Sequence, residues 1–337
     1  MKKIDYLLLF GIIMISIFGV VMIYSASYVW AEYKFHDPLK FAKTQLLFLV
    51  VSYILIFFSL KIPYQKYLSS ANLIFFICFI LLILVLIPGI GTVRNGSRSW
   101  FGIGGFGIQP SEFTKLGMII FTSKYLAYNE KVLKNIKSGV LPILGVLMLI
   151  FGLIMLQPDF GTGVIIVISI IVLLFVSGVN MSFFIKLGFI GLLGVVALII
   201  AAPYRMKRIV SFLNPWSDPL GSGFQIIQSL YAIGPGGLLG LGFGNSIQKH
   251  FYLPEPQTDF IFAIISEEFG FLGILIVVSL FLLIIYRGFH ISIHCENKFG
   301  KYLSFGITFQ LAFQALLNLM VVVGLIPVTG VVLRGIL

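Results

Sequence analysis

Some ionisable residues stand inside or at the edges of long apolar segments, where a membrane makes charge costly and a functional role the default expectation. The first pair follows Gln109 and Pro110 at the start of such a segment. Glu112 suits the positive end of a helix, and Lys115 lies three residues further along the same helix face. The pair is either a structural salt bridge inside a helix bundle or a site where Lys115 binds a phosphate. The sequence leaves both interpretations open.

The second group opens the apolar segment 258–286 and contains Asp259. Thr258 could cap a helix here and leave Asp259 in its first turn, which would be a purely structural role. Asp259 also follows the longest loop, at the mouth of the predicted bundle, where a membrane-bound substrate could meet an aqueous one. Glu267 and Glu268 lie about 12 Å deeper and point to different faces, so they cannot both share a site with Asp259. Asp259 is therefore the best candidate for carboxylate chemistry.

Five further residues are candidates for supporting roles near such a site. Asp159 stands in a tight turn, where it would most often be a turn residue or a helix cap. Arg98 and Trp100 lie in a glycine-rich loop and could hold an anion against an aromatic ring. Arg205 and Arg208 follow the seventh apolar segment, where neutralising anionic lipid headgroups is the commoner role.

Several other kinds of site are excluded by pattern. The glycine-rich stretch 234–244 looks like a phosphate cradle, but no alternation of strands and helices surrounds it, so we exclude a dinucleotide-binding fold and expect no organic cofactor. His290 and His294 lack the glutamate that a zinc helix requires, and no other metal-ligand spacing occurs. Two cysteines cannot form a disulfide framework. No basic block is long enough to bind nucleic acid.

Composition indicates what must position these residues. Of 337 residues, 59% are hydrophobic and 10% are charged, whereas about a quarter are charged in soluble domains. Because about 20 apolar residues cross a bilayer, we predict an all-α, polytopic membrane helix bundle that forms a single domain, 1–337, with a large outward loop at 203–257. The nine predicted transmembrane helices lie near 6–26, 44–60, 69–88, 110–127, 139–156, 162–179, 185–202, 258–286 and 302–326.

Charge sets the expected orientation. With the N-terminus inside, the short inner loops carry about half of the 23 Lys and Arg residues, in fewer residues than the outer loops contain. Only Asp5, Glu130 and Glu296 are acidic residues on that inner side. We therefore expect a cytoplasmic N-terminus and carboxylate chemistry that faces outward.

Five motifs occur in order and carry a resemblance. They are Asn95-Gly96-Ser97-Arg98-Ser99-Trp100, Gln109-Pro110-Ser111-Glu112, Gln157-Pro158-Asp159-Phe160-Gly161-Thr162, Asn214-Pro215-Trp216 and Pro256-Gln257-Thr258-Asp259-Phe260-Ile261-Phe262-Ala263. Together they resemble the SEDS proteins of bacterial cell-wall synthesis (FtsW, RodA and SpoVE) over essentially the whole chain. The segment 249–258 looks most like the FtsW/SpoVE branch, and the sporulation type is the most similar.

The resemblance implies a peptidoglycan glycosyltransferase that polymerises lipid II on the outer face of the bacterial cytoplasmic membrane, in cell division or sporulation, with a class B penicillin-binding transpeptidase as partner. It places the catalytic carboxylate at Asp259 and the substrate-binding residues at Arg98, Trp100, Glu112 and Lys115. One base suffices, because a diphosphate leaving group needs no protonation by a second carboxyl group. The resemblance also implies a divalent cation, Mg²⁺ or Mn²⁺, for which no motif is present. Whether Asp259 removes a proton or orients the hydroxyl stays open.

Two other functions compete with polymerisation. A lipid II flippase would need polar groups along the full depth of the bundle, whereas the inner halves of most predicted spans carry no charge. A non-catalytic scaffold would recruit the transpeptidase alone. After Gly330 the family pattern continues into a tenth helix that this sequence does not contain. We therefore expect a chain shortened at its C-terminus, with that end outside and its activity in doubt.

Overall fold

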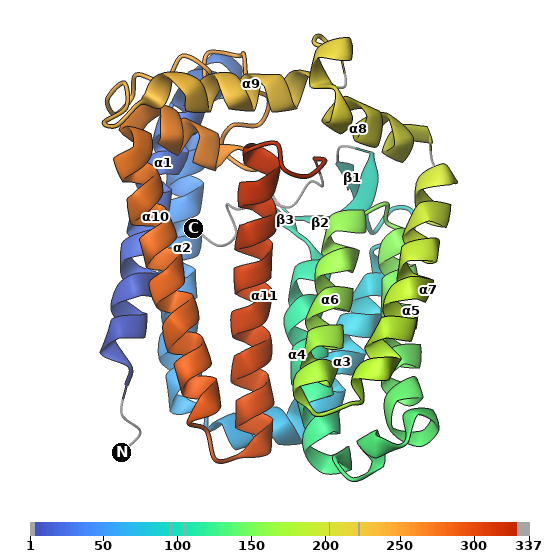
Figure 1. Cartoon of the computed structure of the whole chain (residues 1–337). Helices are drawn as coiled ribbons and strands as arrows, with labels where there is room; N and C mark the ends of the chain where they lie inside the picture. Colours follow the sequence, from blue (N-terminus) through green and yellow to red (C-terminus); the bar gives the residue numbers. More distant parts are fainter. Residues whose placement is uncertain (1–3, 95, 104–105, 202, 222, 329–337) are drawn as a thin grey trace. The chain divides into compact units, whose positions relative to one another are not determined.

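The computed structural model describes residues 4–94, 96–103, 106–201, 203–221 and 223–328 (Figure 1). In these ranges a helix coincides with every predicted span, which confirms the all-α membrane fold. Six stretches are long and apolar enough to cross a bilayer, among them 136–155, while α6 and α7 are shorter apolar helices. Among the described residues, the helices that coincide with the predicted spans are α1 (Tyr6–Phe35), α2 (Lys40–Lys61), α3 (Tyr64–Leu84), α4 (Pro110–Asn129), α5 (Leu141–Met155), α6 (Phe160–Val176), α7 (Met181–Ile200), α10 (Ile261–Ile293) and α11 (Lys298–Val322).

The chain forms two compact units. Among the described residues, the first contains 4–61, 192–287 and 311–328, and the second contains 62–191 and 288–310. The helices α7, α10 and α11 each contribute to both units. The predicted tail from Thr329 onward lies outside the described residues.

The first unit packs α1 against α10. Its core joins Met22 and Ile23 of α1 to Ile264 of α10 and Ala232 of α9 (Phe224–Ile233). As a result α9 lies across the ends of α1 and α10 (Figure 1). The predicted outward loop is thus partly helical, with α8 (Pro203–Leu213), α9 and the short turns η3 (Pro215–Ser217) and η4 (Gly234–Gly236).

The start of α1 is fixed by Asp5. Its carboxylate accepts a hydrogen bond from the Leu8 amide at 3.0 Å, which caps the helix, and it also binds the Arg287 guanidinium at 2.5 Å. The Arg287 guanidinium and the Leu8 amide together hold the pKa of Asp5 below its ordinary value. The contact with Arg287 and the capping bond from Leu8 therefore both favour the charged form of Asp5.

The helix α10 breaks at Gly270, whose φ of 59° is left-handed. Regular helix would bond the amides of residues 271 and 272 to the carbonyls of Glu267 and Glu268. Instead, the amides of Leu241 and Gly242 donate to those two carbonyls at 2.9 and 3.0 Å, and the amides of Phe271 and Leu272 donate to the carbonyls of Gly237 and Leu238 at 2.9 and 3.2 Å. The glycine-rich loop thus satisfies these two carbonyls and these two amides at the break, as membrane burial requires.

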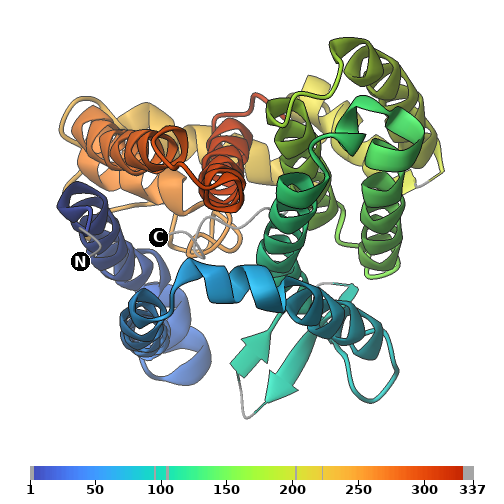
Figure 2. The same cartoon turned by 90° about the horizontal axis from the view of Figure 1, so that it is seen from below.

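The second unit contains α3 to α6 (Figure 2), in which α4 packs against α3 and α6, and α5 packs against α6. The core is formed by apolar residues that include Leu82, Met118, Leu147 and Ile170, one from each of these helices. A small antiparallel sheet between α3 and α4 was not predicted. Its strands are β1 (Thr92–Arg94), β2 (Ser97–Ile103) and β3 (Phe106–Ile108), in the order β1-β2-β3.

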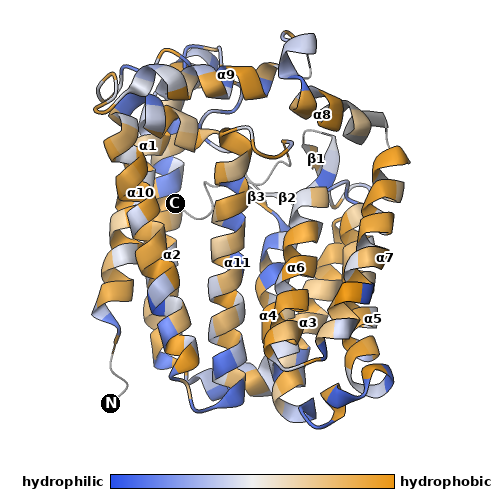
Figure 3. Ribbon diagram, viewed as in Figure 1, coloured by the Kyte–Doolittle hydropathy of each residue, from blue (hydrophilic) through white to orange (hydrophobic). Residues whose placement is uncertain are grey.

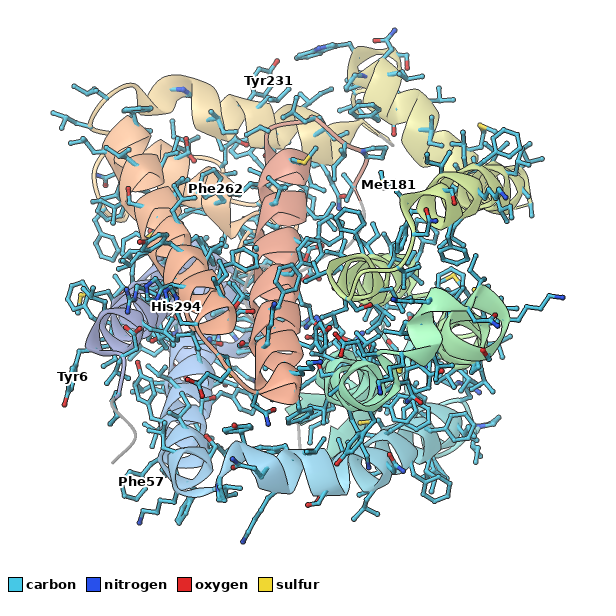
Figure 4. The ribbon with its side chains drawn as sticks, turned by 60° about the horizontal axis from the view of Figure 1, so that its bottom comes forward. Tyr6, Phe57, Met181, Tyr231, Phe262 and His294 are labelled. Atoms are coloured by element: carbon cyan, nitrogen blue, oxygen red, sulfur yellow. The ribbon has the colours of Figure 1, made fainter. Side chains whose placement is uncertain are left out.

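Hydrophobic residues predominate along the long helices (Figure 3). No described residue of α2 is buried, and its Phe57 is 56% exposed. Tyr6 of α1 and Met181 of α7 likewise point outward, whereas Phe262 of α10 is buried (Figure 4). Exposed apolar faces of this extent on long helices fit a lipid environment.

Candidate functional site

The start of α4 holds the predicted Glu112–Lys115 pair. Pro110 occupies the first helical turn, where its missing amide hydrogen costs nothing, and Glu112 follows in that turn. The Lys115 ammonium lies 2.8 Å from the Glu112 carboxylate, with 3% of the lysine side chain exposed and 47% of the glutamate side chain exposed. The structural salt bridge that the sequence left open is therefore present. It holds a buried cation against a carboxylate that reaches the surface.

Asp159 caps α6, as the turn pattern predicted. Its Oδ1 accepts a hydrogen bond from the Thr162 amide at 3.2 Å. Its Oδ2 accepts hydrogen bonds from the Gln109 amide group at 2.8 Å and from the Ser111 hydroxyl at 3.4 Å. These bonds join the starts of α4 and α6. Asp159 thus holds together the end of the second unit that carries Glu112.

Arg98 and Trp100 lie on β2, two residues apart. The pairing of β2 with β1 shifts register between these two residues, so alternation along the strand does not determine whether their side chains share a face. Ser97 and Ser99 hydrogen-bond to each other at 3.0 Å, and the Ser97 hydroxyl also donates to the carbonyl of Gln157. These bonds fasten the strand to the turn before α6. The pairing of a cation with an aromatic ring at Arg98 and Trp100 stays a prediction.

Asp259 lies outside α10, which corrects the sequence prediction of a helix capped by Thr258. The helix begins at Ile261, and the Thr258 hydroxyl donates to the carbonyl of Glu255 at 3.1 Å instead of capping it. Asp259 is half-buried in the preceding loop. Its backbone carbonyl accepts a hydrogen bond from the Asn318 side chain of α11 at 2.8 Å.

Glu267 and Glu268 are both buried in a polar cluster with the loop before Asp259. Glu268 lies 2.8 Å from the Lys249 ammonium and accepts hydrogen bonds from the Ser25 hydroxyl at 2.7 Å. Glu267 accepts from the Ser246 hydroxyl at 2.5 Å and from the Ile247 amide at 2.8 Å. The sequence predicts a helix-packing role for at least one of the two glutamates and a possible supporting role at the site for Glu267. Packing contacts are present for both residues, and both carboxylates bind the same loop.

The side chains of two predicted residues are not described, and the other predicted residues lie in two different units. Arg205 and Arg208 belong to α8, but their side chains lie outside the described part of the structure. Asp259 and Glu267 belong to the first unit, whereas the predicted residues Arg98, Trp100, Glu112, Lys115 and Asp159 belong to the second. Contacts therefore join Glu112 with Lys115 and connect Glu267 with the loop that leads to Asp259.

Two residues of this region escaped the sequence analysis as site residues. Lys249 is fully buried, and Asn318 holds the backbone of Asp259. A signal for Asn318 exists, because Gln310, Gln314 and Asn318 recur at every fourth position of an otherwise apolar helix and so share one face. Polar residues in a membrane helix commonly bond across helices.

The described residues do not by themselves form a metal site. No group of three or more histidine, cysteine or acidic side chains gathers among them. The two neighbouring carboxylates, Glu267 and Glu268, already bind Lys249, hydroxyls and backbone amides. A divalent cation therefore stays a prediction from the resemblance, and no chemical step is assigned to one.

Comparisons with known proteins agree along the whole sequence. The profile of the cell cycle proteins FtsW, RodA and SpoVE matches residues 6–335. Stage V sporulation protein E of Bacillus subtilis (strain 168) is 52% identical over 329 residues, which cover 98% of this chain and 90% of that protein. The probable peptidoglycan glycosyltransferase FtsW of Trichlorobacter lovleyi is 40% identical, with 98% and 86% covered.

Solved structures are similar too. A chain from a structure described as a peptidoglycan synthase complex that coordinates polymerization and crosslinking has a TM-score of 0.80 and 29% identity, covering 98% of this chain and 91% of that chain. The rod shape determining protein RodA of Thermus thermophilus has a TM-score of 0.69 and 26% identity, with 98% and 88% covered.

Proposed function

Because this chain belongs to the FtsW, RodA and SpoVE family of cell cycle proteins, we propose that it is a peptidoglycan glycosyltransferase that extends glycan strands from lipid II. The observation that carries the proposal is the match over residues 6–335 to relatives that include a probable peptidoglycan glycosyltransferase. The half-buried Asp259 supports it, because this carboxylate stands before a helix with its backbone fixed by Asn318.

The chemistry requires one base. A sugar hydroxyl attacks the anomeric carbon of a second sugar, the new glycosidic bond forms, and the bond to the lipid diphosphate breaks. The diphosphate leaves with the bonding electrons, and Asp259 takes the hydroxyl proton. A carboxylate that removes a proton in the transition state typically contributes about 10²–10⁴-fold to a rate. The loop backbone of Asp259 is held before substrate arrives, which favours such a role.

The leaving diphosphate requires positive charge. Family resemblance assigns substrate binding to Arg98, Trp100, Glu112 and Lys115. The two cations in this set are Arg98 and Lys115. The burial of Lys115 strengthens its attraction for an anion, because water screens it little. Glu112 keeps this ammonium in place, and Trp100 lies two residues from Arg98 on β2. In this proposal the two cations offset charge that develops on the diphosphate.

The proposed setting is the outer face of the bacterial cytoplasmic membrane, with the N-terminus in the cytoplasm and a class B penicillin-binding transpeptidase as partner. The distribution of basic residues supports this orientation. Similarity to a chain of a synthase complex for polymerization and crosslinking supports a partner of this kind.

The test is polymer formation from purified lipid II by the full chain, with and without the transpeptidase. Asp259→Asn keeps the size of the side chain and removes the base, so we expect the polymerisation rate to fall by about a hundredfold or more. Glu32→Gln removes an exposed carboxylate of α1 in the same unit and serves as the matched control.

Each competing function gives a different result in this assay. Wild-type chain that makes no polymer under either condition, yet still binds the transpeptidase, would indicate a scaffold. Lipid II that crosses vesicle membranes without being polymerised would indicate a flippase. Normal polymer formation by Asp259→Asn would remove Asp259 from the mechanism.

A further inference from the structure

A cluster of buried charged residues contacts the start of the segment that carries Asp259. Residues 246–249 precede it, and Glu267 and Glu268 follow it on α10. Lys249 and Glu268 form an ion pair at 2.8 Å with both side chains fully buried, and the Lys249 ammonium also contacts the Ser25 hydroxyl at 3.3 Å. A buried pair persists when further hydrogen bonds satisfy its remaining atoms. Ser25 and Ser246 supply these bonds to Glu268, at 2.7 and 3.4 Å.

Glu267 forms a second set of hydrogen bonds with the same loop, at residues 246–248. Its carboxylate accepts hydrogen bonds from the Ser246 hydroxyl at 2.5 Å and from the amides of Ile247 and Gln248 at 2.8 and 3.3 Å. Both carboxylates therefore bind one short stretch of backbone. Joining the ends in this way removes most of the conformations that an open loop of this length would sample.

The backbone of α10 fixes the same region from within. The break at Gly270 separates a short outer helix, 261–269, from the rest of α10, and the glycine-rich loop forms four backbone hydrogen bonds across that break. The short outer helix therefore has a set direction. Asp259 stands two residues before it.

The backbone of the segment before Asp259 is strained at two residues, and this strain requires contacts that hold the segment. Phe251 and Glu255 have φ of 66° and 49°, which are unfavourable for residues with side chains. Strained residues of this kind persist where the surrounding structure determines them. The T-shaped contact of Phe251 with Tyr33 of α1, with ring centroids 5.3 Å apart, is one such contact.

Asn318 completes the arrangement from a different helix. It is fully buried, and its side-chain amide donates to the Asp259 carbonyl at 2.8 Å. This hydrogen bond fixes the orientation of the Asp259 peptide group and thereby the position of the Asp259 side chain.

We infer that Asn318 and the cluster of Lys249, Glu267 and Glu268 are positioning residues for the carboxylate of Asp259. Asn318 acts from α11, and the cluster acts on residues 246–249, at the start of the segment that leads to Asp259. This inference rests on the proposed role of Asp259. It assigns the two buried glutamates to neither proton transfer nor substrate binding. Their function is to give one carboxylate a fixed location at the end of a broken helix.

Asn318→Leu tests the inference with a small change, since the side chains are similar in size and the hydrogen bond to the Asp259 carbonyl is lost. Because small misplacement of a reacting group lowers the rate steeply, we expect kcat for polymerisation of purified lipid II to fall by about tenfold to a hundredfold. KM should stay within about twofold, since substrate binding is untouched. Ser229→Ala is the matched control, because it removes a buried 2.7 Å hydrogen bond to the Val322 carbonyl of α11.

Hydrogen exchange provides a readout that does not depend on activity. In the full chain, Asn318→Leu should speed amide exchange in residues 255–263 and leave α2 unchanged. The double variant Lys249→Met with Glu268→Gln removes the pair without leaving a lone buried charge, and it should speed exchange over residues 246–260. Exchange and kcat equal to the wild type in both variants would overturn the inference.

The two readouts separate this inference from the proposed function. Full activity of Asp259→Asn would refute the role of Asp259, whereas exchange in residues 246–263 would still report whether the segment is held. Loss of activity in Asp259→Asn with unchanged kcat in Asn318→Leu would refute the positioning role alone.

Discussion

Lys115 and Glu112 form one ion pair in unequal surroundings. The lysine side chain is 3% exposed, whereas the glutamate side chain is 47% exposed. Water can hydrate the glutamate if its partner is lost, but it cannot reach the lysine to the same extent. The two partners therefore contribute differently to stability, although the distance between them is shared.

This asymmetry predicts unequal effects of substitution. Glu112→Gln leaves a buried ammonium without its carboxylate and should lower the free energy of unfolding by about 1–3 kcal/mol. Lys115→Met replaces the buried cation by an apolar side chain of similar length and should lower it less. Thermal unfolding of both purified variants in detergent measures the difference. A larger loss for Lys115→Met would contradict this account of the pair.

Residues whose role is local were predictable. Pro110 in the first turn of α4, the Asp159 cap of α6 and the Glu112–Lys115 pair depend on neighbours within a few positions, so spacing predicts them. Thr258 was predicted wrongly because Glu255 offered its hydroxyl an acceptor that competes with the helix. Asn318 was missed because its partner lies 59 positions away.

At the scale of elements, the glycine-rich loop and α10 fold as one structure. The spans themselves were predictable from apolar length, whereas the break in α10 was not, because it depends on hydrogen bonds from residues 237–242. A small sheet before α4 was missed for a similar reason, since its strands have only three to seven residues. Short strands carry little periodicity.

The break predicts that Gly270 tolerates no side chain. A Cβ there would lie 2.5 Å from the Gly240 nitrogen and 2.6 Å from the Gly236 oxygen, and φ is left-handed. Gly270→Ala should lower the free energy of unfolding by at least about 1–3 kcal/mol. Gly145→Ala on α5 is the control, since a Cβ there meets nothing within 4 Å and alanine favours a helix by about 1 kcal/mol. Equal melting temperatures of the two variants would refute a rigid break.

At the scale of the whole molecule, charge and apolar surface determine the expected orientation. The formal charge is +11, and the predicted inner loops hold most of the excess. Exposed apolar side chains on α2 and α7 leave lipid as the natural surrounding of these helices. The number of crossings and their direction remain predictions, because hydropathy and length alone support six spans.

The native cysteines allow a direct test of orientation. Cys78 is buried, and Cys295 is partly exposed in the turn between α10 and α11, which we predict to be cytoplasmic. In a Cys78→Ser background, a membrane-impermeant maleimide should label Cys295 only after the cells are permeabilised. Adding Ser217→Cys, at an exposed position after α8, should give labelling of intact cells. The reverse pattern would place the N-terminus outside.

The hydrogen bond from Asn318 to Asp259 also has a consequence during synthesis. Residue 318 leaves the ribosome 59 residues after the residue it holds. During that interval a nascent chain already displays Asp259 and its loop, but α11 has not yet entered the membrane. Fixing of the proposed catalytic carboxylate therefore coincides with insertion of the last described helix, which in our proposal would keep a partly made chain from acting on cell-wall precursors.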